Sequence, residues 1–162
     1  MDSQTISFSR LLADSYLHWT GEEMLHGLST LSDKAAAEAI DQAPFGLVAH
    51  GTQADPIFCY GNQMALALFE MSWDEFTAMP SRLSAPPAAD MQDDRNRLMA
   101  EALKKGYVEN YHGVRISKMG RRFEITDTIL WNVVDAQGNR HGQAALIRDT
   151  RRLHSVVVKA GL

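Results

Sequence analysis

The sequence has almost none of the cysteine that cross-links very small or extracellular proteins. Its 162 residues include one cysteine, Cys59, which excludes an intramolecular disulfide and a zinc site built on two thiolates. The longest apolar runs, such as residues 129–134, are far shorter than the roughly 20 residues that span a bilayer. The first residues lack the basic and apolar stretches of a secretory signal. We therefore expect one cytoplasmic globular domain, without a membrane span, whose core needs no cross-links.

Long basic stretches are also missing, although charge is distributed unevenly. The net charge is −4, but residues 1–94 carry 3 basic and 14 acidic side chains, whereas residues 95–162 carry 13 and 6. The basic clusters are short and lack interleaved aromatic residues, so nucleic acid is not an expected partner. We interpret the asymmetry as an acidic helical layer beside basic strands within one molecule, with a site for an anionic partner as the alternative.

The first forty residues are predicted to be helical. Their apolar side chains fall into two stripes at helical spacing, and the capping-box spacing of Thr20 and Glu23 predicts where the second helix begins. The stripes consist of Phe8, Leu12, Tyr16 and Trp19, and then of Met24, Leu28, Leu31 and Ala35. Residues 1–41 are thus predicted to be a helical extension that packs on a sheet or on a partner.

The remaining pattern predicts strands on both sides of a helical region. Asn62 is a predicted N-cap, Ser72 and Glu75 have capping-box spacing, and a third helix is predicted from Asp90 to a stop at Gly106. The predicted strands cover residues 45–51, 56–61, 107–117, 121–134 and 142–149. Hairpins without regular β-α-β alternation indicate an α+β fold with an antiparallel sheet. We assign residues 42–150 to this core and residues 151–162 to a C-terminal tail.

Several ordered motifs carry a family resemblance. The stretch YGNQMALALF at residues 60–69, followed by SWDE, resembles the strand-to-helix passage of PAS domains. The motifs HG…DP, PSRLS, YHGVRI, GRRF and HGQAA resemble the MEKHLA family, a PAS-like module found as short bacterial proteins and at the C-terminus of plant homeodomain-leucine-zipper factors. The resemblance covers about residues 10–148. It implies a five-stranded antiparallel sheet with short central helices, and a role in sensing, ligand binding or dimerisation.

Two cofactors of PAS-like proteins can be compared with this chain. A light-sensing flavin domain of the LOV type requires an Asn-Cys-Arg signature on the helix after the second strand, and that signature is missing. Cys59 falls on the predicted second strand, where we expect a buried small apolar side chain. No two histidines have helical metal-ligand spacing, so haem and zinc are not expected. The cofactor, if there is one, stays unknown.

Polar residues within predicted strands mark a candidate cavity. Asn110 and His112 share a face of the third strand with apolar neighbours, and Asp127 interrupts an apolar face of the fourth. A buried carboxylate needs donors, so Asp127 should meet His112, Asn110, Gln143 or a ligand. The alternative is a purely structural hydrogen-bond cluster. A β-bulge would instead turn Asp127 toward the N-terminal helices, and Thr126 and Thr128 would face the cavity.

Arginine and aromatic side chains complete the candidate site. Arg115 and Arg82 are predicted to hold a carboxylate ligand through bidentate hydrogen bonds, or else to pair with acidic residues of the chain. Tyr60 and Trp131 are predicted walls of the cavity or simply core residues.

Three functions follow from these observations. The first is a sensory or regulatory module that binds a small ligand between sheet and helices and signals through protein contacts. The second is a homodimer formed through the N-terminal helices, without a ligand. The third is a small acid-base enzyme that uses Asp127 and His112. We expect the first, and no enzymatic activity.

Overall fold

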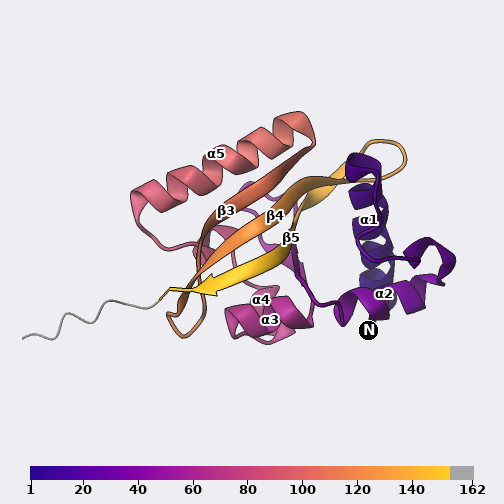
Figure 1. Ribbon diagram of the computed structural model, residues 1–162, viewed down its shortest axis with the longest axis horizontal. Coiled ribbons are helices and arrows are strands. Elements are labelled where there is room, and N and C mark those ends of the chain that lie inside the picture. The colour runs from indigo at the N-terminus through magenta and orange to yellow at the C-terminus, as the bar shows by residue number, and fades with distance from the viewer. Residues whose placement is uncertain (154–162) are drawn as a thin grey trace, which may run out of the picture.

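The computed structural model describes residues 1–153, which form one five-stranded sheet. The strands lie in the order β2-β1-β5-β4-β3, and all neighbours are antiparallel (Figure 1). Their bounds are β1 (Gly46–His50), β2 (Phe58–Gly61), β3 (Tyr107–Ile116), β4 (Arg122–Val134) and β5 (Arg140–Arg152). The predicted α+β fold is confirmed. Of the predicted tail, residues 151 and 152 belong to β5, and residues 154–162 lie outside the described part of the chain.

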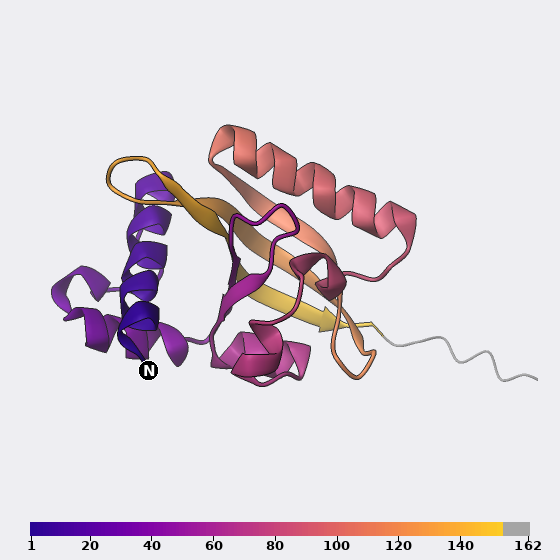
Figure 2. The ribbon, with the colours of Figure 1, turned by 180° about the vertical axis from the view of Figure 1, so that it is seen from behind.

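The helices form two separate groups. The first contains α1 (Ser3–Thr20), the 3-10 turn η1 (Leu28–Thr30) and α2 (Asp33–Asp41); the second contains α3 (Gln63–Phe69), α4 (Trp73–Phe76), the turn η2 (Ser81–Ser84) and α5 (Ala89–Lys105). Figures 1 and 2 show α1 and α2 together at one end of the strands, with α3, α4 and α5 away from them. The predicted N-terminal helical extension therefore packs on the sheet of its own chain.

Each helical group covers its own apolar core because successive strand residues point to opposite faces. Leu146 packs in the cluster beneath α1 and α2, whereas the next residue, Ile147, packs in the cluster beneath α3 and α5. Likewise, Trp131 packs in the cluster beneath α1 and α2, and Leu130 packs in the other cluster. Leu12 and Tyr16, from the first predicted apolar stripe, are fully buried in the cluster beneath α1 and α2.

Most predicted helix signals act as expected. The Asn62 side chain accepts the backbone N–H of Ala65 and begins α3, and Ser72 and Glu75 form a capping box at α4. Helix α5 ends at Gly106, as predicted. The predicted start of α5 is wrong in detail: Asp90 lies in its first turn, and the N-cap is Ala88, which has no side-chain cap bond.

The predicted helix start at Thr20 is wrong. Helix α1 runs through Thr20, whose hydroxyl donates to the Tyr16 carbonyl, and Gly21 ends the helix in a left-handed conformation. A second left-handed glycine, Gly27, keeps the following segment irregular, so α2 begins only after its N-cap Ser32.

Two irregularities change which faces β3 and β4 present. Asn110 (φ 53°) and Asp127 (φ 46°) adopt positive φ, and the pairing of β3 with β4 shifts register between Val108 and Tyr111 and again before Gly113. A bulge of this kind moves side chains to the other face of a strand. The predicted common faces of β3 and β4 are therefore wrong on either side of these positions.

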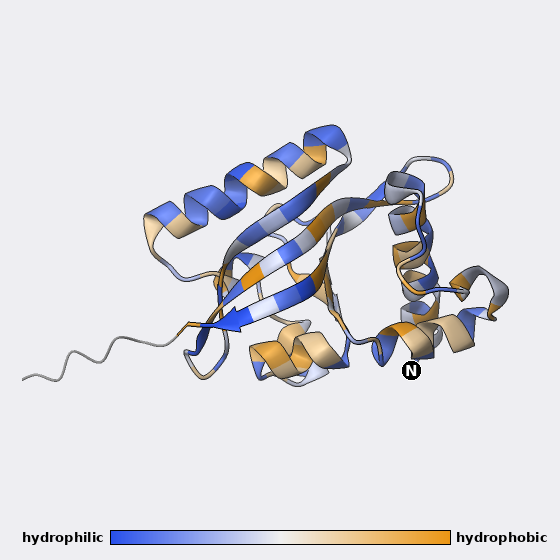
Figure 3. Ribbon diagram, viewed as in Figure 1, coloured by the Kyte–Doolittle hydropathy of each residue, from blue (hydrophilic) through white to orange (hydrophobic). Residues whose placement is uncertain are grey.

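Ion pairs join the acidic and basic parts of the chain. Glu70 pairs with Arg121 at 2.8 Å, and Glu75 pairs with Lys118. Figure 3 shows hydrophilic residues along the outer end of β5, away from α1 and α2.

Within residues 1–153, no helix combines the length and apolar character that a membrane crossing requires.

Candidate functional site

A small cavity lies between the sheet and the second group of helices. Its volume is about 30 Å³, which is space for one or two water molecules. Apolar side chains such as Val48, Phe58 and Ile125 make much of its wall. Its polar wall residues are His50, Ser84, Arg95, Tyr111, Arg115 and Gln143. We call this space the inner cavity.

Arg95 enters the inner cavity from α5. It lies on the helix face that also carries Leu98, Met99 and Ala102, so it points toward the sheet and is only 6% exposed. Its Nη2 donates to Ser81 Oγ at 2.7 Å, but its Nε has no hydrogen-bond partner among the described residues. Burial, aided by the charge of Arg115, lowers the pKa of Arg95 to about 10.

Arg115 reaches the same cavity from β3. It is 7% exposed, its Nη1 donates to the Val114 carbonyl at 2.8 Å, and its Nη2 donates to the Tyr111 hydroxyl. The guanidinium also lies 5.5 Å from the centre of the Tyr111 ring, a favourable cation-π distance. Neither Arg95 nor Arg115 forms an ion pair within residues 1–153, and no Asp or Glu lines the inner cavity. Among the described residues, these two buried guanidinium groups thus have no carboxylate partner inside the cavity.

His50 adds a third polar group that lacks a partner. It ends β1, is 5% exposed, and neither ring nitrogen has a hydrogen-bond partner among the described residues. Burial, together with the nearby charge of Arg95, lowers the pKa of His50 to about 4, although the adjacent Gln143 amide opposes the shift. The imidazole is therefore neutral at pH 7.

A chain of hydrogen bonds joins the inner cavity to α1. Gln143 of β5 is buried, and its Nε2 donates to the Met99 carbonyl at 3.0 Å and to Asn132 Oδ1 at 3.1 Å. The backbone carbonyl of Asn132 in turn accepts a 2.8 Å hydrogen bond from Nε1 of Trp19, on the other side of the sheet. Gln143 and Trp19 of α1 are therefore connected through one intermediate residue, Asn132.

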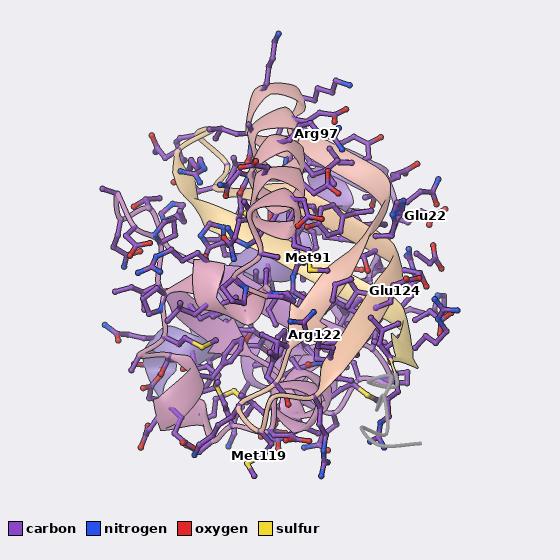
Figure 4. All side chains as sticks on the ribbon, turned by 90° about the vertical axis from the view of Figure 1, so that its left-hand side faces the viewer. Glu22, Met91, Arg97, Met119, Arg122 and Glu124 are labelled. Carbon is purple, nitrogen blue, oxygen red and sulfur yellow. The ribbon has the colours of Figure 1, made fainter. Side chains whose placement is uncertain are left out.

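A wider groove lies outside the inner cavity, between α5 and strands β3 and β4. Its volume is about 570 Å³. Figure 4 views this side of the molecule, where Met91 and Arg97 of α5 and Glu124 of β4 mark the groove wall. Three residues line both spaces, namely Arg95, Tyr111 and Arg115. These three side chains therefore separate the inner cavity from the outer groove.

The structure brings three predicted residues together, but at the surface. Asn110, His112 and Asp127 all line the outer groove and are exposed. The predicted burial of Asp127 is wrong, because its positive φ places it where the side chains of β4 change face. The alternative for a bulge is not met either: Thr126 and Asp127 line the outer groove, and the buried Thr128 lines neither space.

Other predicted residues lie elsewhere. Trp131 packs under α1, where its Nε1 donates to Ser15 Oγ at 3.0 Å, and Tyr60 is buried in the same cluster, so neither is a cavity wall. Arg82 is exposed and pairs with Asp55 at 3.2 Å. Cys59, expected to be buried, is exposed, because β2 is an edge strand whose outer face is uncovered at this residue.

Arg115 and Gln143 are the predicted residues that line the inner cavity, while Arg95 and His50 were missed as part of the site. One signal for Arg95 was present: it interrupts the apolar stripe of α5. His50 stands in an otherwise apolar strand, where nothing local separates a site residue from a core residue. Within residues 1–153, no three metal-binding side chains gather closely enough to hold an ion.

Comparison with known proteins now identifies the family. The family model of the MEKHLA domain matches residues 6–151. The chain belongs to the MEKHLA domain family. Among curated proteins, none matches this MEKHLA domain.

Solved structures similar to this MEKHLA domain are PAS and light-oxygen-voltage domains. A PAS domain from Colwellia psychrerythraea has a TM-score of 0.61 at 15% identity over 74% of this chain and 95% of its own. An RNA-binding light-oxygen-voltage receptor gives 0.63 at 17% identity over 77% of this chain and 35% of its own. The PAS domain of a LuxR-family regulator from Burkholderia thailandensis, in complex with ethanol, gives 0.54 at 15% identity, over 72% and 95%. Such low identities establish the PAS-like fold of this MEKHLA domain and nothing of its ligand.

Proposed function

We propose that this MEKHLA domain is a sensory module that binds a small ligand between the sheet and α5 and reports its occupancy through α1. The observation that carries this proposal is the hydrogen-bonded path from Gln143 through Asn132 to Trp19. Gln143 lines the inner cavity, so a ligand there competes for its amide group. A ligand that changes this amide's partners favours a different packing of α1 by population shift.

The size of the inner cavity sets how a ligand binds. A space of about 30 Å³ is too small for an organic molecule. The ligand must therefore occupy the outer groove as well, or displace α5 from β3. The ethanol complex of the Burkholderia thailandensis PAS domain supports a small ligand as an occupant of this fold.

An enzymatic role is not proposed. The acid-base hypothesis needs a carboxylate in an apolar cavity, as in enzymes that raise a pKa by burial. Asp127 and His112 are instead both exposed on the outer groove.

Native mass spectrometry and an absorption spectrum of freshly purified protein test ligand binding. We expect a small mass in addition to the polypeptide, which denaturation removes. Hydrogen exchange of residues 3–20, before and after removal of that mass, tests the path to α1. In Gln143→Leu this exchange difference should shrink, whereas Gln137→Leu, in an exposed turn, should keep it. A protein that carries no ligand, and whose α1 exchange no compound alters, overturns the proposal.

Homodimerisation through residues 6–40 is the alternative. Leu12 and Tyr16 are already buried within the chain, so a dimer would have to use exposed residues such as Leu17 of α1. The same native mass spectra report the oligomeric state. A dimer that Leu17→Glu dissociates, without any bound ligand, favours this alternative over the sensor.

A further inference from the structure

We propose that the ligand is a small organic acid, whose carboxylate is held between the guanidinium groups of Arg95 and Arg115. This inference rests on the proposed function and adds the chemical class of the ligand. The acid group lies at the boundary of the inner cavity and the outer groove, and the rest of the molecule lies in the groove.

Uncompensated charge is the first argument. Two guanidinium groups, 6% and 7% exposed, form no ion pair within residues 1–153 and line an inner cavity without a described acidic residue. The carboxylates of Asp90, Asp94, Glu124 and Asp127 line the outer groove. Burying a charge without a paired counter-ion is costly. An anion between Arg95 and Arg115 supplies the missing charge.

Unused hydrogen-bonding atoms are the second argument, independent of charge. Arg95 Nε and both ring nitrogens of His50 are buried without a partner among the described residues. Buried polar groups normally have partners, so such atoms mark the position of an absent group. A carboxylate has two oxygens that accept several hydrogen bonds, and the planar guanidinium fork matches its geometry.

The shape of the site favours a carboxylate over a larger anion. The inner cavity has room for a group of one or two water volumes, and apolar residues such as Val48 and Ile125 line the rest of it. The outer groove, with about 570 Å³, provides space for the remainder of a small acid. Arg95 and Arg115 lie where the two spaces meet, since both residues line each of them.

Pairs of compounds that differ in charge test the class of ligand. Acetate and acetamide, and benzoate and benzamide, are titrated into the purified full chain at constant ionic strength, with calorimetry as the readout. We expect the carboxylates to bind at least about tenfold more tightly than their amides, because charge-assisted hydrogen bonds to two arginines are lost in the amides. Inorganic phosphate is titrated in parallel.

Matched variants locate the binding site. Arg115→Gln and Arg95→Gln should each weaken carboxylate binding at least about tenfold. Arg122→Gln, an exposed arginine of β4 that lines neither space, should leave it within about twofold. Because a buried variant can fail to fold, the Nε–Hε signals of Arg95 and Arg115 are also followed by NMR in the unmodified protein, where acetate should shift both.

The outcomes separate the two proposals. Tighter binding of an amide or of phosphate overturns the carboxylate class but leaves the sensory function in place. Equal loss in Arg122→Gln, or arginine signals that acetate does not move, overturns the position of the site. If none of these compounds binds and native mass spectrometry finds no ligand, the sensory function fails together with this inference.

Discussion

Acid should destabilise this protein before its carboxylates titrate, because His50 is buried and has no hydrogen-bond partner among residues 1–153. Its pKa is about 4 in the folded protein, against 6.5 for an ordinary histidine. A depressed histidine pKa means that the unfolded chain binds the proton more readily. Above pH 6.5, His50 is neutral in both states and does not lower the unfolding free energy. As pH falls from 6.5 toward 4, the unfolded chain takes up the proton first, and the unfolding free energy decreases.

The size of this effect follows from the pKa difference. One pKa unit corresponds to about 1.4 kcal/mol, so the full effect is about 3 kcal/mol. Between pH 7 and pH 5, where most carboxylates remain ionised, the expected loss in unfolding free energy is about 2 kcal/mol. The loss arises mainly because burial disfavours the charged imidazolium, and the positive charge of Arg95 adds to it.

Urea unfolding followed by tryptophan fluorescence measures this loss, at pH 7 and pH 5 in buffers without carboxylates. His50→Gln should lose about 2 kcal/mol less than the unmodified protein over this interval. His112→Gln, which removes an exposed histidine, should behave like the unmodified protein. If His50→Gln had the same pH dependence as the unmodified protein, His50 would not be the group that causes the loss.

Four further substitutions test the packing that supports the site. Asn62→Ala should lower the unfolding free energy by about 2–4 kcal/mol, since the buried amide binds four backbone groups; chemical denaturation measures it. Gly106→Ala places a Cβ 2.3 Å from the Trp19 ring at φ 99°, and should cost more than about 2 kcal/mol in the same assay. Gly120→Ala, at φ 81° in open space, should cost only about 1 kcal/mol, and equal losses would contradict the predicted clash. Ser72→Ala should cost about 1 kcal/mol by removing the capping box of α4, and an unchanged thermal midpoint would exclude that contribution.

Local signals in the sequence predicted the elements well where one residue acts on its neighbours. Asn62, Ser72 and Gly106 end or begin helices as predicted, because caps depend on backbone groups within one turn. The signal at Thr20 failed for the same reason. Gly21 directly after it stops the helix, and its left-handed conformation outweighs a capping-box spacing.

Side-chain direction was harder to predict than secondary structure. The positive φ at Asn110 and Asp127 moves neighbouring residues to other faces of β3 and β4. Asp127 therefore lies at the surface, and Thr128 is buried in its place. Strict alternation along a strand cannot reveal where a bulge occurs, since a bulge depends on the partner strand.

Apolar periodicity, turn residues and ordered motifs were enough to predict the α+β class, the five antiparallel strands and the family. They also placed Arg115 and Gln143 among the candidates. The folded chain was needed to find that Arg95 of α5 and His50 of β1 line the same cavity, where no described acidic residue pairs with the arginines. Burial and charge compensation depend on groups distant in the chain, which meet only when the helices pack on the sheet.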